Sequence, residues 1–254
     1  MSDPTPPALR ITGLGLQIGA ATILKDVDLD VTRGALIGVI GPNGAGKTTL
    51  FNAISGVVRP TAGRIEMAGQ DITGMSVAQR ARAGLGRTFQ TSSLFPGLTV
   101  LENVRLAAQA ALGGSYTLLR FPRRRDEAST IAREKLDEVC LSHKIDALAG
   151  DISHGDKRKL EIAVLLATRA QTVLLDEPMA GVASGDVTGL VDSIRELHAA
   201  TDCTMLMVEH HIDVLMGLVE KVAVMYFGSI IAFDTPARVM ADPVVQSAYL
   251  GSAA

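Results

Sequence analysis

The fold of this chain is decided by residues 35–48, which read Ala-Leu-Ile-Gly-Val-Ile-Gly-Pro-Asn-Gly-Ala-Gly-Lys-Thr. The first part, Ala35–Ile40, is a continuous apolar run of the kind that a buried parallel strand needs. A glycine-rich loop follows at once, and after it comes a segment with helical periodicity, Thr48–Ser55, which ends at Gly56. The order strand, glycine loop, helix predicts an α/β fold.

Other strand-like segments lie on both sides of this unit. Upstream, Leu9–Ile18 and Ile23–Val31 predict an antiparallel β ribbon at the N-terminus. Downstream, Thr172–Leu175, Thr204–Val208 and Val222–Tyr226 are short apolar runs that alternate with helical patterns. Strands that alternate with helices imply a mostly parallel sheet covered on both faces.

Between Thr91 and Ala167 the pattern is helical, with little strand character. We therefore expect residues 1–254 to form one domain, in which residues 9–90 and 168–254 build an α/β core and residues 91–167 an inserted helical lobe. The expected helices are Leu101–Leu112, Asp126–Cys140 and Asp156–Thr168. The basic run Arg120–Arg125 in this lobe is either a solvated loop or a contact for a partner protein or lipid headgroups.

Composition excludes several classes of function. The formal net charge is −3, so there is no general basic field, and we expect no nucleic-acid partner. Cys140 and Cys203 lie far apart in sequence, and we interpret them as buried or incidental thiols of a cytosolic protein. The longest apolar candidate, Val222–Phe233, is broken at Gly228 and predicts two strands and a turn, so we expect no membrane span.

The glycine loop carries the strongest chemical signal. Residues 41–48 match the P-loop pattern G-x-x-x-x-G-K-[ST] at every required position. Glycines let successive N–H groups turn toward a polyphosphate, and the following helix directs its positive end at the same charge. Lys47 then reaches the β- and γ-phosphates, and the Thr48 hydroxyl binds Mg²⁺. The residues predicted to hold the nucleotide here are Gly41, Pro42, Asn43, Gly44, Ala45, Gly46, Lys47, Thr48 and Thr49.

Two carboxylates follow the apolar strand Thr172–Leu175. A neighbouring parallel strand would place Asp176 near the Mg²⁺, and Glu177 on the γ-phosphate side, where hydrolysis needs a base or a positioner for water. The alternative is that both are helix caps or solvated charges.

In this order, the motifs resemble those of the ATP-binding cassette (ABC) family along nearly the whole chain. After the P-loop, the sequence has Arg87-Thr-Phe-Gln90 at the Q-loop, Ile152-Ser-His-Gly-Asp156 at the signature motif, Leu174-Leu-Asp-Glu-Pro178 at Walker B and Val208-Glu-His210 at the switch histidine. The resemblance implies a P-loop NTPase of the ABC ATPase type. Such a fold has a RecA-like, mostly parallel sheet, an N-terminal antiparallel ribbon and an inserted α-helical subdomain.

Further segments resemble the ATPase subunits of branched-chain amino acid importers, whose close relatives serve urea or short amides. These segments are Arg87–Gln90, Leu98–Asn103, Leu160–Ala163 and Ala248–Gly251.

The resemblance also implies roles for single residues. Gln90 would contact Mg²⁺ and the attacking water, which makes Thr48, Gln90 and Asp176 the expected metal ligands. Ser153 and Gly155 would open a helix whose N-terminus meets the γ-phosphate bound to the opposite subunit. His210 would hydrogen-bond the γ-phosphate, so Glu177, His210 and Gln90 are the expected catalytic residues, while His211 would be exposed without such a role.

Three positions depart from the family pattern. Ile18 stands where an aromatic side chain in the early ribbon stacks on adenine, so we expect weaker nucleotide binding. Asp156 replaces the last glutamine of the signature and brings negative charge toward the phosphates, which argues against a direct contact with ATP. Ala183 replaces an aspartate after Walker B, so communication between two sites would run through backbone or Ser184.

The resemblance implies an ATPase that hydrolyses MgATP on the cytoplasmic face of the plasma membrane as a peripheral subunit. Its implied partners are membrane-spanning permease subunits, a second ATPase subunit (a paralogue or a second copy) and, indirectly, a solute-binding protein. The alternatives are a regulatory cassette that binds ATP with little hydrolysis, a soluble cassette acting in translation or repair, and a small-molecule kinase. The direction of transport, import, comes from the resemblance alone.

Overall fold

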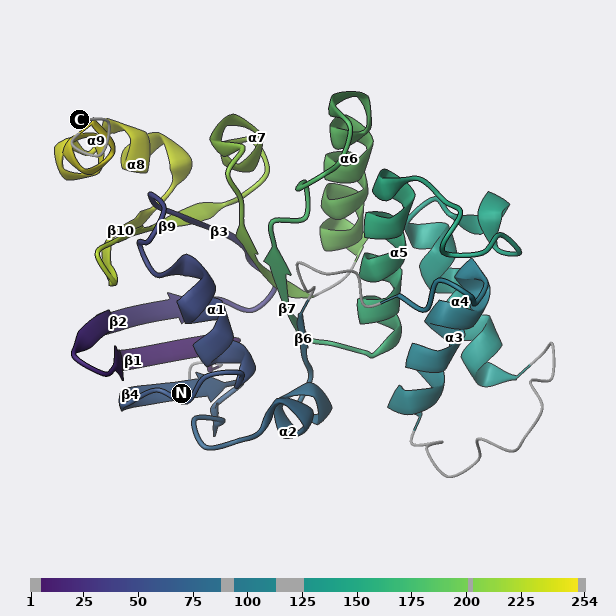
Figure 1. Cartoon of the computed structure of the whole chain (residues 1–254), viewed down its shortest axis with the longest axis horizontal. Coiled ribbons are helices and arrows are strands. Elements are labelled where there is room, and N and C mark those ends of the chain that lie inside the picture. Colours follow the sequence, from purple (N-terminus) through teal and green to yellow (C-terminus); the bar gives the residue numbers. More distant parts are fainter. Residues whose placement is uncertain (1–5, 88–93, 113–125, 201–202, 251–254) are drawn as a thin grey trace, which may run out of the picture.

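A computed structural model describes residues 6–87, 94–112, 126–200 and 203–250 (Figure 1). The strands form two sheets. A four-stranded sheet has the order β2-β1-β4-β5, and a six-stranded sheet has the order β10-β9-β3-β8-β7-β6. The predicted α/β architecture, with a mostly parallel sheet and an antiparallel N-terminal sheet, is confirmed.

The six-stranded sheet carries the functional loops. β3 pairs in parallel with β8 and β9, β7 pairs in parallel with β6 and β8, and only β10 is antiparallel. Every residue of β3, β7 and β8 is buried, which explains why these strands are mostly apolar in the sequence. The strands are β3 Leu36–Ile40, β6 Leu85–Arg87, β7 Thr172–Asp176, β8 Thr204–Val208, β9 Lys221–Tyr226 and β10 Ser229–Asp234.

The N-terminal sheet is larger than the predicted ribbon. β1 Leu9–Ile18 pairs with β2 Ala21–Val31, so the hairpin turn is two residues long and the second strand begins two residues earlier than predicted. β4 Ala62–Met67 adds to the other edge of β1, and the short β5 Gln70–Asp71 follows it. Only two of the six residues of β4 are buried, so its sequence carries little apolar pattern.

Helices cover the sheets and form the lobe. The three helices predicted for the lobe are present as α3, α4 and α5, each displaced by one or two residues from its predicted bounds, and they pack against one another. The bounds are α1 Lys47–Ser55, α2 Val77–Arg82, α3 Val100–Ala111, α4 Glu127–Glu138, α5 His154–Ala167, α6 Ser184–Ala200, α7 Ile212–Met216, α8 Pro236–Ala241 and α9 Pro243–Leu250. A 3₁₀ turn spans Ser142–Lys144. Within the described ranges, none of these helices is long and apolar enough to cross a bilayer.

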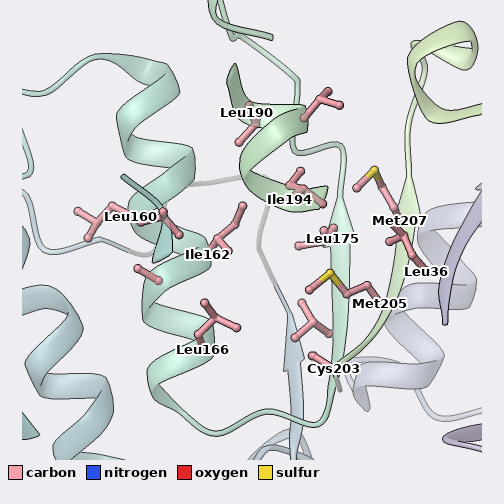
Figure 2. Close-up of a cluster of buried hydrophobic side chains, with 14 of the residues drawn as sticks. Leu36, Leu160, Ile162, Leu166, Leu175, Leu190, Ile194, Cys203, Met205 and Met207 are labelled. Atoms are coloured by element: carbon pink, nitrogen blue, oxygen red, sulfur yellow. The ribbon is translucent and has the colours of Figure 1, made fainter. Parts of the chain in front are cut away.

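One hydrophobic core joins the lobe to the sheet. Figure 2 shows Leu160, Ile162 and Leu166 of α5 on one side and Leu175 and Met205 of the sheet on the other, and α6 contributes further residues to the same cluster. A second core, around Phe51 and Ile54 of α1, lies between the two sheets. The lobe and the N-terminal sheet therefore each pack against the central strands that carry the site.

Candidate functional site

The P-loop connects β3 to α1 in a conformation that depends on glycine. Gly46, the residue before α1, has a φ of 103°, a left-handed value that suits glycine. A Cβ on Gly41 would collide with the carbonyl oxygen of Met225 on the neighbouring strand β9. The loop therefore lies directly against the sheet. It leads straight into the N-terminus of α1, the positive end of that helix, as predicted.

Lys47 is held inside this loop. Its side chain is only 7% exposed, and Nζ donates to the carbonyl oxygens of Gly41, at 2.6 Å, and Pro42, at 3.1 Å. Burial lowers the pKa of Lys47, and the negative charge of Glu177 partly offsets that effect. The ammonium group is thus placed where phosphate oxygens can replace the two carbonyls. Thr48 is exposed on the first turn of α1, and Thr49 is half-buried.

Asp176 ends β7 and is 1% exposed. Arg87, the last residue of β6, donates from Nη2 to Asp176 Oδ2 at 2.7 Å. The Nη1 group of the same arginine donates to Asn52 Oδ1, at 2.7 Å, and to Ser55 Oγ, at 2.8 Å, on α1. Arg87 thereby ties two strands to the helix that follows the P-loop. This role of Arg87 could not be predicted beyond its place in the Q-loop motif, since its partners lie up to 89 positions away in the sequence.

Glu177 and His210 lie together although 33 positions separate them in the sequence. His210 Nε2 is 3.0 Å from Glu177 Oε1, and the backbone N–H of Glu177 donates to Val208 O at 2.9 Å. Glu177 has a φ of 49°, which is a costly backbone conformation for a residue with a side chain. The two predicted catalytic groups are therefore close to each other at the end of neighbouring strands.

Glu209 is a functional candidate that the sequence reasoning missed. The residue is 3% exposed, and its Oε1 accepts a hydrogen bond from the Met179 N–H at 2.7 Å. Its Oε2 accepts from the N–H of His210 at 3.1 Å. This carboxylate holds the segment after Walker B against the switch histidine. A glutamate directly after the mostly apolar run Thr204–Val208 was the signal that could have identified it.

The signature segment begins α5 as predicted. Ser153 is the N-cap, and its Oγ accepts from the Asp156 N–H at 3.2 Å. Asp156 accepts from Lys144 Nζ at 2.5 Å and from Ser153 Oγ at 2.9 Å. Burial raises the pKa of Asp156, but the hydrogen bonds from Lys144 and Ser153 and the Lys144 charge outweigh it and lower the pKa overall. The negative charge expected at this helix end is therefore paired with a lysine. Gly155 is buried, and a Cβ there would meet the side chain of Asp186.

The other predicted residues fall into three groups. Ile18 is 60% exposed at the end of β1, and His211 is exposed, as expected. The carbonyl of Ala183 accepts from the Asp186 N–H at 2.8 Å, at the start of α6. Gln90 and the basic run Arg120–Arg125 lie outside the described residues, so their predicted roles stay predictions.

A cavity of about 230 Å³ opens between the P-loop and the switch histidine. It is lined by Ile40, Gly41, Pro42, Asn43, Glu209, His210 and Ile212. A cavity of about 780 Å³ lies at the opposite ends of the strands, next to Gly34, Thr172 and Thr204. Ligands of open parallel sheets bind outside the carboxyl ends of the strands, and the smaller cavity is the one at that edge.

The residues present fit a Mg²⁺ ion that binds together with phosphates. Thr48 lies one helical turn before Asn52, on the same face of α1. Arg87 donates hydrogen bonds to both Asn52 and Asp176, so the Thr48 hydroxyl and the Asp176 carboxylate face the same region. Mg²⁺ prefers such oxygen ligands, one or two from the protein and the rest from phosphates and water. In the part of the chain that the structure describes, no cluster of three or more His, Cys, Asp or Glu residues forms an all-protein metal site.

Comparison with known proteins agrees with this geometry. Residues 24–180 match the ABC transporter family, and residues 229–254 match the branched-chain amino acid ATP-binding cassette transporter family. The sequence is 35% identical over 252 residues to BraF of Pseudomonas aeruginosa, a high-affinity branched-chain amino acid transport ATP-binding protein, covering 97% of this chain and 99% of that one. It is 34% identical, with the same coverage, to LivG of Escherichia coli K12, which has the same description.

The fold also matches a solved structure. It superimposes on the ADP conformation of MJ1267, an ATP-binding cassette of an ABC transporter, with a TM-score of 0.85 at 32% identity, covering 97% of this chain and all of that one. The predicted ABC ATPase fold and the predicted resemblance are therefore confirmed. The chain belongs to the ABC transporter family, as an ATP-binding cassette of the branched-chain amino acid transporter type.

Proposed function

We propose that this chain is the ATP-hydrolysing subunit of an importer for branched-chain or other hydrophobic amino acids. The observation that carries the ATPase proposal is the 3.0 Å contact between Glu177 and His210 at the edge of the sheet where the P-loop holds Lys47. A carboxylate that can orient or deprotonate water, held by an imidazole and close to a buried ammonium group that can bind phosphate, suits phosphoryl transfer to water.

The chemistry follows from these positions. Phosphate oxygens replace the carbonyls of Gly41 and Pro42 on Lys47, and the N–H groups of the P-loop surround them. Glu177 orients or deprotonates the attacking water, whose oxygen bonds to the γ-phosphorus as the bond to the bridging oxygen of ADP breaks. His210 fixes the Glu177 carboxylate and hydrogen-bonds the γ-phosphate. Mg²⁺ held by Thr48, Asp176 and Gln90 would supply positive charge to the phosphates.

The proposal includes an assembly. Two cassettes close head to tail, so that the N-terminus of α5, with Ser153 and Gly155, meets the γ-phosphate bound to the opposite subunit. We favour a paralogous second ATPase subunit over a second copy. The pair works on the cytoplasmic face of the plasma membrane, bound to permease subunits near Gln90, and an external solute-binding protein selects the cargo.

The test is steady-state MgATP hydrolysis by the purified chain, alone and with its membrane subunits. We expect Glu177→Gln to abolish turnover while ATP binding remains. Glu196→Gln removes an exposed carboxylate from α6 by the same change and should leave turnover unaltered. Hydrolysis that survives Glu177→Gln would contradict the assigned role. Binding without turnover, even with the membrane subunits added, would favour a regulatory cassette.

The cargo needs a separate test, because relatives in this branch also serve urea or short amides. Cells that lack the chain should lose uptake of labelled leucine, isoleucine and valine, and regain it when the wild-type chain is restored. Loss of urea or amide uptake with normal leucine uptake would replace the amino-acid proposal and leave the ATPase proposal intact.

A further inference from the structure

Phe227 occupies a position that suits its residue type poorly. It is 78% exposed and has a φ of 44°, and Gly228 after it has a φ of 82°. Together they form the two-residue turn between β9 and β10, where Tyr226 pairs with Ser229. Such turns favour Asn-Gly, because the first residue must also adopt a left-handed conformation. An exposed, strained aromatic residue needs an explanation beyond packing.

The turn that carries Phe227 is fixed against the P-loop. The N–H of Gly228 donates to the carbonyl oxygen of Ala45 at 3.0 Å. On the other side, the N–H of Lys25 on β2 donates to the Gly228 carbonyl at 2.9 Å, and Ser229 Oγ donates to Lys25 O at 2.8 Å. Figure 1 shows the β9–β10 hairpin beside β2 and the loop that precedes α1. Phe227 is thus rigidly placed one residue from a direct contact with the P-loop.

The ring itself is supported on one side only. The Tyr226 ring lies 4.4 Å from it, centroid to centroid, in an edge-to-face arrangement. The remaining surface of Phe227 is exposed, and the next residue, Gly228, accepts a hydrogen bond from Lys25 of the ribbon strand β2. That ribbon offers an exposed aliphatic side chain, Ile18, where the family resemblance leads one to expect an aromatic ring. An aromatic side chain is therefore present next to the residue that contacts the P-loop, but it lies on the β9–β10 turn and not on the ribbon that carries Ile18.

We propose that Phe227 supplies the aromatic surface on which the base of the bound nucleotide stacks. The inference rests on the proposed nucleotide site at the P-loop and adds the contact that recognises the base. The ligand is a nucleotide whose phosphates bind residues 41–48. Stacking uses only the flat face of a base, so this contact accepts guanine as readily as adenine.

The absence of tryptophan from the whole sequence allows a direct experiment. In the full chain carrying Phe227→Trp, MgADP should quench the fluorescence of the single indole. Magnesium pyrophosphate, which has no base, should leave that fluorescence unchanged. Phe95→Trp is the matched control, because Phe95 is also exposed, at 57%, but lies at the start of the lobe. Quenching of Phe227→Trp by pyrophosphate to the same degree, or no quenching by MgADP, would overturn the inference.

A second variant separates binding from folding. Asn is well suited to the left-handed first position of the turn, so Phe227→Asn should fold with an unchanged or higher melting temperature. It should nevertheless bind MgADP roughly tenfold more weakly by calorimetry, since stacking on an aromatic side chain is lost. Equal affinity for MgADP in wild type and Phe227→Asn would overturn this inference alone. Failure of the wild type to bind MgADP would overturn the proposed nucleotide site and this inference with it.

Discussion

Cys140 and Cys203 illustrate how position alone separates two chemically identical side chains. Cys203, next to β8, is buried, and burial raises the pKa of its thiol to about 11. Cys140, after α4, is exposed. Because the thiolate is the reactive form and needs access to the reagent, only one of these residues can react readily in the folded chain.

We therefore predict that a thiol reagent at pH 8 modifies Cys140 quickly and Cys203 only on unfolding. Mass spectrometry of the labelled peptides measures this directly, with the chain in denaturant as the control that labels both. Rapid modification of Cys203 in the folded protein would show that the end of β8 opens readily.

Asp156 gives a prediction about pH. Its pKa is lowered in the folded state, so its stabilising contribution is fully present above the unfolded pKa and is lost as pH falls through the lower, folded value. Wild type should be more stable than Asp156→Asn at pH 7, and the difference in melting temperature should shrink below about pH 4. A difference that stays constant from pH 7 to pH 3 would mean that the Lys144 pair contributes nothing to folding.

At the scale of elements, α1 depends on a buried arginine from another helix. Arg80 of α2 is almost completely buried and donates to Ala53 O and Ile54 O, two of the last three carbonyls of α1. It also donates to Thr73 O and Met75 O. Carbonyls at a helix end have no partner inside the helix. This guanidinium satisfies Ile54 O and shares Ala53 O with the N–H of Gly56, so it is a main donor to the end of the helix that follows the P-loop.

Arg80→Met should consequently destabilise the chain by about 3 kcal/mol, since several buried carbonyls lose their donor. The melting temperature should fall by roughly 5–10 °C. Arg82→Met, two residues away and exposed, is the control and should change little. A small change in melting temperature in Arg80→Met would mean that water molecules donate to these carbonyls in place of the guanidinium.

The elements also show what the sequence could predict. The strands β3, β7 and β8 and the helices α1 and α5 were predicted to within two residues, because each has a contiguous pattern. β6 was missed because its three residues, Leu85–Arg87, are too short for any period to emerge. The pairs Arg87–Asp176, Lys144–Asp156 and Met179–Glu209 join positions 12 to 89 apart. Such pairs depend on how elements distant in sequence pack together, which no local pattern encodes.

For the whole molecule, the N-terminal sheet and the lobe each pack against the central strands that carry the site. Gly228 joins the P-loop to β2, and a Cβ there would collide with the carbonyl oxygen of Ile23. Gly228→Ala should therefore separate the N-terminal sheet from the P-loop, lowering both the melting temperature and the affinity for MgADP. Gly217→Ala, at the end of α7, is the control, because a Cβ there meets only ordinary contacts. A Gly228→Ala protein that binds MgADP like wild type would show that the junction is dispensable.

The bridge between Arg87 and Asp176 has a consequence for the order in which ligands arrive. Before any ligand binds, the carboxylate of Asp176 already has a cation at 2.7 Å, and Lys47 lies within the field of Glu177. A free divalent cation would thus meet a site whose negative charge is already matched. We expect calorimetric titration with MgCl₂ alone to show no saturable binding up to about 1 mM, because proteins usually bind Mg²⁺ together with substrate phosphates and not in all-protein cages. With ADP present, binding should saturate, because the metal enters as the partner of the phosphates and not ahead of them.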